Sequence, residues 1–207
     1  MTTISIIGTG TMGNVIADIL SPGATGTQII DRDRAKAEAL AERINGTSAT
    51  LDDAITGDIV VLALPFGAVD EVLDAVDVQL AGKTVVDITN PVDFTSFDGL
   101  MVPADSSAAA QMAARFPEAN VLKAFNASFG AALVARQVAG QDLAVLVAGD
   151  DADAKSALIE LVDQGGLRGV DAGSLNCARE LGALGFLSIT LAAAGKTSWA
   201  TGFVLVP

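Results

Sequence analysis

A glycine-rich turn near the start of the chain constrains the fold more than any other feature. The apolar run 4–7 leads directly into a G-x-G-x-x-G pattern over residues 8–13, and Asp31 follows 18 residues after its last glycine. Apolar residues then recur at helical spacing as far as Leu20, and Pro22 ends that helix. A strand, a glycine turn and a helix with an acidic residue about 20 positions on are typical of dinucleotide binding. The sequence therefore predicts a nicotinamide dinucleotide site at this turn.

The three glycines of the pattern have separate predicted tasks. Gly8 permits the tight turn, Gly10 lets the backbone approach a pyrophosphate, and Gly13 lets the helix pack close to the strand. The N-terminus of the helix offers free N–H groups and a partial positive charge to anionic phosphates. An ordinary glycine turn is the alternative for the motif alone, and its flanking elements favour dinucleotide binding.

Strands and helices alternate along the chain, which predicts an α/β fold with a doubly wound parallel sheet of the Rossmann type. After the first strand and helix, strands are expected over 27–30, near 48, and over 58–64, 83–88, 120–125, 141–148 and 167–170. Helices are expected over 34–44, 106–116, 151–164 and from 174 onward. We place a domain boundary near 140. Residues 1–140 form a dinucleotide-binding domain, and residues 141–207 a small C-terminal α/β lobe that completes a second-cofactor cleft.

The chain contains no histidine and no tyrosine. Mechanisms that use an imidazole base or a tyrosine acid are therefore excluded, as are histidine-ligated zinc and Ser-His-Asp hydrolysis. What remains is chemistry with little proton transfer, or proton transfer through other groups. Hydride transfer between two bound cofactors is such a chemistry, and we predict no catalytic acid or base for it.

Charge and cysteine content limit the partners and the compartment. A net charge of −13 makes nucleic acid and anionic membrane surfaces poor partners, and it fits either an ordinary acidic protein or a salt-adapted one. The single Cys177 excludes an internal disulfide, and no basic residue precedes the first strand, so we expect a cytoplasmic protein without a signal peptide. The apolar tail 203–207 predicts a homodimer interface.

Ligands of doubly wound sheets gather outside the carboxyl ends of the strands. Here those ends include the glycine turn, 31–32, 64–66 and 89–91. The predicted cofactor-binding residues are Gly8, Thr9, Gly10, Thr11, Met12, Gly13, Asp31, Arg32, Lys36, Leu64, Pro65, Phe66, Asn90 and Pro91. Simple strand termination is the alternative for both prolines, and a turn cap is the alternative for Asn90. We predict no metal site, because the acidic residues at 150–153 are suited to capping a helix.

With these motifs the chain resembles the NADP-dependent deazaflavin reductases, and the related oxidoreductase domain of STEAP-type ferric reductases. The resemblance rests on the glycine turn and on four further strings: Leu64-Pro65-Phe66, Gly149-Asp150-Asp151, Gly166-Leu167-Arg168, and Asp171-Ala172-Gly173 followed by Arg179. It implies a hydride transfer between NADP(H) and a deazaflavin, which in that family lies across the nicotinamide and partly under the C-terminal segment.

The sequence departs from the family at the residues that face the adenine ribose. The family pattern there is Ser-Arg with a lysine a turn later, all serving the 2′-phosphate of NADP. This chain has Asp31-Arg32, with Lys36 in place. Arg32 and Lys36 favour NADP(H), whereas Asp31 accepts a hydrogen bond from a free 2′-hydroxyl and repels a phosphate, which favours NAD(H). The family pattern favours NADP(H), and a third possibility is that both basic side chains are only solvated surface charges.

Several alternatives stay open at this point. A reductase of flavin, quinone or ferric chelate fits the same motifs, and so does a nucleotide sensor without turnover. Gly182 and Gly185 within an apolar helix indicate the close approach of a ligand, a second helix or a second subunit. Trp199 is suited to the core, to a dimer contact or to a lid over the second cofactor.

Overall fold

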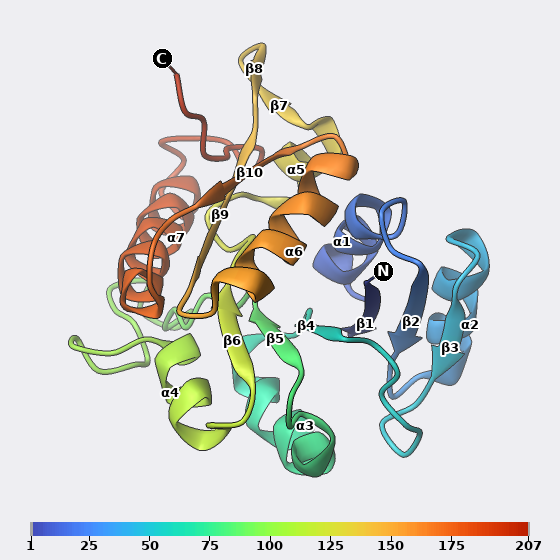
Figure 1. The fold of residues 1–207 in the computed structure, drawn as a ribbon. Coiled ribbons are helices and arrows are strands. Elements are labelled where there is room, and N and C mark those ends of the chain that lie inside the picture. The colour runs from blue at the N-terminus through green and yellow to red at the C-terminus, as the bar shows by residue number, and fades with distance from the viewer. Residues whose placement is uncertain (1, 207) are drawn as a thin grey trace.

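The structure, a computed structural model, describes residues 2–206 and is built on a central sheet with helices on both faces (Figure 1). Its strands are β1 (Thr3–Ile7), β2 (Gly26–Ile30), β3 (Thr47–Ala49), β4 (Ile59–Leu62), β5 (Thr84–Asp87), β6 (Asn120–Lys123), β9 (Ala144–Gly149) and β10 (Arg168–Asp171). Its helices are α1 (Thr11–Leu20), α2 (Arg34–Arg43), α3 (Val69–Val76), α4 (Ala108–Arg115), α5 (Gly130–Ala135), α6 (Ala152–Gln164) and α7 (Ala178–Ala193). These eight strands form one sheet in the order β10-β9-β6-β5-β4-β1-β2-β3.

The sheet is mostly parallel, as predicted, with one reversal. β6 pairs with β9 in antiparallel register through Lys123 and Ala148, and β10 then pairs parallel to β9. The connection from β6 to β9 passes through the six-residue helix α5, which rises about 9 Å, less than the ~13 Å of a four-residue strand. A hairpin of β7 (Gln137–Val138) and β8 (Gln141–Asp142) then feeds β9 from the carboxyl edge.

Two hydrophobic clusters fill the space between the sheet and its helices. One face of the sheet packs against α1, α2, α5 and α6, with Ile16 and Leu158 fully buried among the strand residues. The other face packs against α3, α4 and the start of α7, where Leu73 and Met112 are buried. The arrangement leaves the carboxyl ends of six strands, β1 to β6, at one edge of the molecule.

The local sequence signals agree with the observed elements. Pro22 follows Ser21, the C-cap of α1, and Asp151 caps α6 by accepting a hydrogen bond from the Ala154 N–H at 2.7 Å. The helix α3 was not among the predicted elements, although Val69, Val72, Leu73 and Val76 follow the 3.6-residue period. The division near residue 140 stays a prediction. Within residues 2–206 no helix is long and apolar enough to cross a membrane.

Candidate dinucleotide-binding site

The glycine turn between β1 and α1 has three different steric environments. Gly8 has φ +107°, and a Cβ there would lie 2.4 Å from the carbonyl oxygen of Ala63. A Cβ on Gly13 would lie 2.0 Å from the carbonyl oxygen of Gly8. A Cβ on Gly10, by contrast, would meet no atom within 4 Å. The fold therefore requires Gly8 and Gly13 to be glycine, whereas the space above Gly10 is open.

The N-terminus of α1 has no side-chain cap. Its N-cap residue is Gly10, which has no side chain to accept from the first N–H groups, and no acidic residue lies in the first turn. The helices α2, α4 and α6 differ, because Asp33, Ser107 and Asp151 accept hydrogen bonds from their first turns. The first backbone N–H groups of α1 are therefore available to an anion, in the direction that the helix dipole favours.

Asp31 stands directly after β2 and holds the glycine turn. Its Oδ2 accepts from the Thr9 N–H at 2.9 Å and from the Thr9 hydroxyl at 2.6 Å, and its Oδ1 accepts from the Asp33 N–H at 2.9 Å. Partial burial alone would raise the pKa of Asp31. The hydrogen bonds from Thr9 and Asp33, with the charge of Lys36, outweigh burial and hold the pKa below its usual value. Asp31 is therefore an anion at neutral pH.

A groove of about 370 Å³ opens at this edge, between the glycine turn, the end of β2 and the start of α3. It is lined by Ile7, Gly8, Thr9, Gly10, Asp31, Arg32, Lys36, Leu51, Ala63, Leu64, Pro65, Ala68, Glu71 and Val72. Eight of the fourteen predicted cofactor-binding residues are among them. Their part in binding stays a prediction, but the fold brings these eight to one cavity.

The six other predicted residues lie elsewhere. Thr11, Met12 and Gly13 belong to the first turn of α1, with Thr11 exposed and Gly13 buried. Phe66 follows the groove residue Pro65 and begins a short 3-10 helix, Phe66–Ala68. Asn90 and Pro91 lie farther along the edge and do not line the groove. Pro91 is buried there.

Charged side chains at the mouth of the groove balance one another. Arg32 lies 4.0 Å from Glu71, and both side chains are about three-quarters exposed. Lys36 lies 3.4 Å from Asp33 and is similarly exposed. Such exposed pairs are weak, so both basic side chains are free to turn toward an anionic ligand.

Asn90 is bound into a cluster that fixes α7 over the ends of β5 and β6. Its Nδ2 donates to the carbonyl oxygen of Asn126 at 3.0 Å, and its Oδ1 accepts from Asn126 Nδ2 at 3.1 Å. Asn126 Nδ2 also donates to the carbonyl oxygen of Leu181 in α7 at 2.7 Å. A Cβ on Gly185 would lie 2.2 Å from Asn90 Oδ1. The groups that lie close to Gly185 thus belong to the loops after β5 and β6 of the same chain.

A buried ion pair lies on the two neighbouring strands β5 and β6. Lys123 is 1% exposed, and its Nζ donates to Oδ2 of the fully buried Asp87 at 2.8 Å and to the carbonyl oxygen of Thr89. The other carboxylate oxygen of Asp87 accepts from the Thr89 N–H at 2.8 Å. Sequence reasoning gave neither residue a role.

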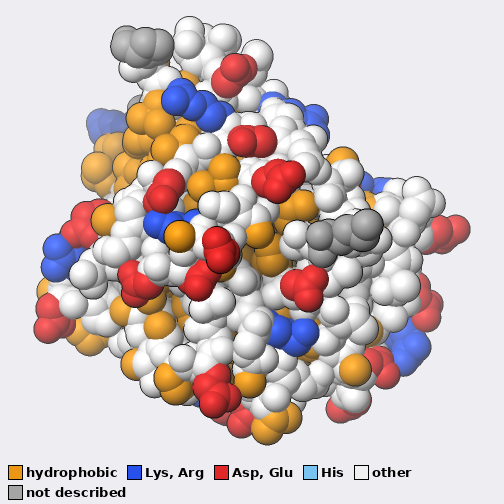
Figure 2. All heavy atoms as spheres, in the orientation of Figure 1, with side chains coloured by type: hydrophobic (Ala, Val, Ile, Leu, Met, Phe, Trp, Pro, Cys, Tyr) orange, Lys and Arg blue, Asp and Glu red, His pale blue; other side chains and the backbone are white. Residues whose placement is uncertain are grey.

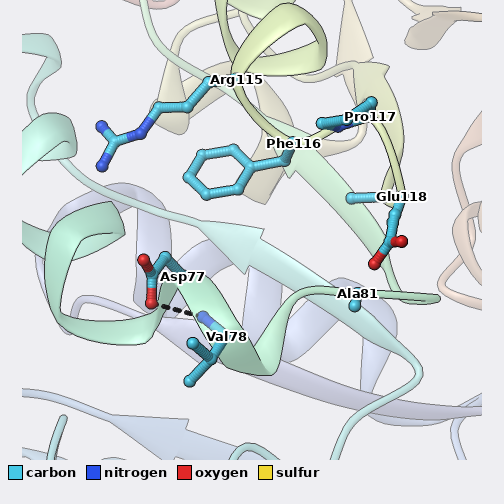
Figure 3. Close-up of a pocket in the computed structure, with 8 residues that line it drawn as sticks. Asp77, Val78, Ala81, Arg115, Phe116, Pro117 and Glu118 are labelled. Atoms are coloured by element: carbon cyan, nitrogen blue, oxygen red, sulfur yellow. Dashed lines mark hydrogen bonds between the residues drawn. The ribbon is translucent and has the colours of Figure 1, made fainter.

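A second hollow of about 640 Å³, larger than the groove, lies at the opposite edge of the sheet (Figure 3). It lies between the end of α3 and the end of α4, where Ala81 and Ala119 come shortly before β5 and β6. Figure 3 shows Phe116 and Arg115 on one side and Asp77 on the other. Arg115 is bonded to Asp74, so the hollow offers no unpaired cation, and it lies away from the carboxyl ends where ligands of such sheets bind.

Sequence reasoning missed residues that shape the site through side-chain contacts. Asn14, one turn into α1, donates from Nδ2 to the carbonyl oxygen of Thr9 at 2.7 Å, and Arg43 of α2 donates to Asn14 Oδ1 at 3.1 Å. Leu51 and Glu71 line the groove from segments distant in sequence. The periodic pattern of α3 was the one available signal for Glu71, since that helix begins at the groove.

The fold and the groove at the carboxyl ends of its strands define an α/β protein of the Rossmann type. Residues 3–91 match the family described as NADP oxidoreductase coenzyme F420-dependent. The chain is 33% identical over 146 residues to the F420-dependent NADP reductase of Methanocaldococcus jannaschii, a stretch that covers 68% of this chain and 64% of that relative. These matches confirm the resemblance to the deazaflavin reductases that the sequence motifs indicated.

Two further relatives agree with this result. The chain is 37% identical over 106 residues to metalloreductase STEAP3 of Rattus norvegicus, which covers 51% of this chain and 20% of that one. A crystal structure from Arthrobacter sp. FB24, provisionally named an F420-dependent NADP-reductase, superposes over the whole of both chains with a TM-score of 0.82 and 27% identity. The chain thus spans 64% and 20% of the lengths of the two curated relatives, and all of the solved one.

Proposed function

We propose that this protein is an oxidoreductase that transfers a hydride between NAD(P)H and a second bound redox cofactor, a deazaflavin. One observation carries the proposal: the uncapped N-terminus of α1 behind Gly10, where the structure leaves open space at the head of a groove. An anionic pyrophosphate fits that space and satisfies N–H groups that no side chain reaches.

The residues of the groove fit the parts of a dinucleotide in order. The turn 8–13 would hold the pyrophosphate, and Asp31, Arg32 and Lys36 would face the adenine ribose. Leu64 and Pro65 would face the nicotinamide half. The nicotinamide supplies or accepts the hydride. The protein supplies binding and orientation, and the chain has no histidine or tyrosine that could take part in proton transfer.

The names of the similar proteins support NADP(H) and a deazaflavin as the two partners. We propose that residues 141–207, with α7 and the tail that follows it, complete the cleft for the second cofactor. The match with a metalloreductase makes a ferric chelate the second candidate acceptor.

The direct test is to mix the protein with an oxidised deazaflavin and to follow its absorbance with NADPH and, separately, with NADH. Bleaching with NADPH is the expected result, and bleaching with NADH alone would reverse the cofactor preference. If nicotinamide binds and no deazaflavin is bleached, the same assay with flavin, quinone and ferric chelate identifies another reductase. Tight binding with no acceptor consumed would indicate a sensor.

Gly10→Val tests the cofactor site itself. The added side chain meets no protein atom at its Cβ, so we expect the variant to fold, and it fills the space that a pyrophosphate needs. The dissociation constant for NADPH should rise at least tenfold, which corresponds to about 1.4 kcal/mol. Gly99→Val is the matched control, because a Cβ there also meets nothing within 4 Å and it lies outside the groove. Unchanged affinity in Gly10→Val would show that the turn is not the cofactor site.

We also propose a homodimer formed through the C-terminal part of the chain. Hydrophobic side chains gather at the upper left of Figure 2, over α7 and the tail, where Leu187 and Trp199 are each 54% exposed and Leu191 and Leu205 are also exposed. Val206 belongs to the same apolar tail, whereas Pro207 lies outside the described residues. A double change, Leu187→Lys with Leu191→Lys, should convert a dimer to a monomer in size-exclusion chromatography. An unchanged elution volume would count against this interface.

A cytoplasmic location is part of the proposal. It is supported by the single cysteine, Cys177, which has no partner in the chain for a disulfide. Fractionation of the producing cells tests it, and recovery from an extracytoplasmic compartment would reject it.

A further inference from the structure

The Asp31 carboxylate has little capacity left for a ligand. A carboxylate offers about four lone-pair positions, and three of those on Asp31 are already used inside the protein. Two of the three bonds come from Thr9, through its N–H and its hydroxyl, and both end on Oδ2. The third comes from the Asp33 N–H to Oδ1. About one position therefore remains for a ribose hydroxyl.

The surroundings of Asp31 offer basic groups at the same end of the groove. Arg32 and Lys36 line the groove with Asp31, and their present partners are exposed carboxylates at 4.0 and 3.4 Å. An acidic residue here ordinarily attracts a free 2′-hydroxyl and repels a 2′-phosphate. Donors that already surround the carboxylate weaken both effects, because they satisfy its oxygens and spread its charge.

We propose that Thr9 sets the cofactor preference of this protein by acting through Asp31, so that its hydroxyl holds the carboxylate on the glycine turn and permits a 2′-phosphate beside it. Thr9 is a positioning residue in this scheme, and the phosphate-binding groups are Arg32 and Lys36. The inference rests on the proposed function, because it needs a dinucleotide in the groove. It explains how a chain with aspartate at this position accepts NADP(H).

Thr9→Val is the decisive variant, because valine keeps the shape and the N–H of Thr9 and removes only the hydroxyl donor. We would measure the dissociation constants of NADPH and NADH from nicotinamide fluorescence, without any acceptor. The expected result is a rise of about tenfold in the NADPH-to-NADH ratio of dissociation constants, because one hydrogen bond to a charged group is lost. General damage to the turn would weaken both dinucleotides equally and leave the ratio unchanged.

A double-mutant cycle shows whether Thr9 acts through Asp31. Asp31→Ser should lower the same ratio about tenfold, because it removes the negative charge beside the 2′-position. Thr9→Val added to Asp31→Ser should then change the ratio less than twofold. Equal effects of Thr9→Val in both backgrounds would overturn the inference, since Thr9 would then act alone. Thr9→Ser, which keeps the hydroxyl, should behave as the unmodified protein.

The chain contains a matched control outside the groove. Thr3 donates its N–H and its hydroxyl to Oδ2 of Asp58 at 3.0 and 2.7 Å, which repeats the Thr9–Asp31 arrangement. Thr3→Val should leave the NADPH-to-NADH ratio unchanged. If the unmodified protein binds neither dinucleotide, the proposed function fails and this inference fails with it. If it binds either one and Thr9→Val leaves the ratio unmoved, only the inference fails.

Discussion

Asp31 and Asp87 both stand at the carboxyl end of a parallel strand, the first directly after β2 and the second as the last residue of β5. Their surroundings are different. Asp31 is half-buried, accepts three hydrogen bonds from N–H and O–H groups, and lines a groove of about 370 Å³. Asp87 is fully buried, and the ammonium group of Lys123 lies 2.8 Å from its Oδ2.

The comparison shows that a carboxylate at the end of a strand can either line an open groove or be packed inside the protein. A carboxylate removed completely from water needs a counter-charge, and the ammonium group of Lys123 supplies it beside Asp87. A half-buried carboxylate can be held by uncharged donors, and it then remains an anion at the wall of an open cavity. The sheet therefore has an open polar end at β2 and a closed one at β5 and β6.

The largest expected loss of stability follows from breaking the buried ion pair at the closed end. Lys123→Met leaves the Asp87 charge buried without a partner, and we expect the free energy of unfolding to fall by about 3–5 kcal/mol. Urea denaturation monitored by circular dichroism measures this. Arg34→Met is the control, because Arg34 lies 3.8 Å from Asp53 on the surface and such a pair contributes less than about 1 kcal/mol.

A second change to the pair sharpens this test. Adding Asp87→Leu to Lys123→Met removes the uncompensated charge, and most of the lost stability should return. If Lys123→Met costs less than the Arg34→Met control, the buried pair is not what stabilises this end of the sheet, and the comparison with Asp31 loses its basis.

The second largest expected loss of stability comes from the packing of α7 against the closed end. Gly185→Ala places a Cβ 2.2 Å from Asn90 Oδ1, so Asn90 or α7 must shift, and we expect a loss of about 1–3 kcal/mol. Gly182→Ala is the matched control in the same helix, because a Cβ there meets no atom within 4 Å. It should stabilise the protein by up to about 1 kcal/mol, through the better helix propensity of alanine. Equal effects on the unfolding free energy would contradict the tight contact at Gly185.

The smallest expected effect on stability is that of the Asp31 carboxylate at the open end, and it depends on pH. The pKa of Asp31 in the folded protein lies below its usual value of 3.8, so its ionised form stabilises the fold above that pH. This contribution is lost as the pH falls through the folded-state pKa. The difference in unfolding free energy between the unmodified protein and Asp31→Asn should therefore be constant from pH 7 to pH 5, and shrink below about pH 4. A difference that grows on acidification would contradict this account of Asp31.

Much of the open end could be predicted from the sequence, because the residues that form it lie close together in the chain. The turn 8–13, the apolar face of α1 and the distance to Asp31 identified the place and direction of the groove. The separate steric demands on Gly8 and Gly13 also followed from the motif. What the sequence did not reveal was the side-chain direction of Asp31, since a bond to Thr9 depends on how two loops approach each other.

The ion pair at the closed end could not be predicted from the sequence, for a different physical reason. Lys123 and Asp87 are 36 residues apart, and a lysine within a strand pattern gives no sign that it is buried. The antiparallel pairing of β9 with β6 could not be predicted either, because it depends on the path that the chain takes between the two strands. Gly185 did signal a close approach, but its partners could be identified only from the folded structure.

The single tryptophan makes the ultraviolet emission of this molecule an unusually local signal. Trp199 packs against Phe129, with ring centroids 5.1 Å apart, and the backbone nearby joins Phe129 N–H to the carbonyl oxygen of Thr201 at 3.0 Å. Since the chain has one tryptophan and no tyrosine, emission excited at the indole band arises from Trp199 alone. A thermal melt followed by fluorescence thus records changes around Trp199, either the release of the tail from α5 or the separation of the proposed dimer, whereas circular dichroism records the loss of helices and sheet. A fluorescence midpoint below the circular dichroism midpoint would mean that the surroundings of Trp199 change before the rest of the protein unfolds.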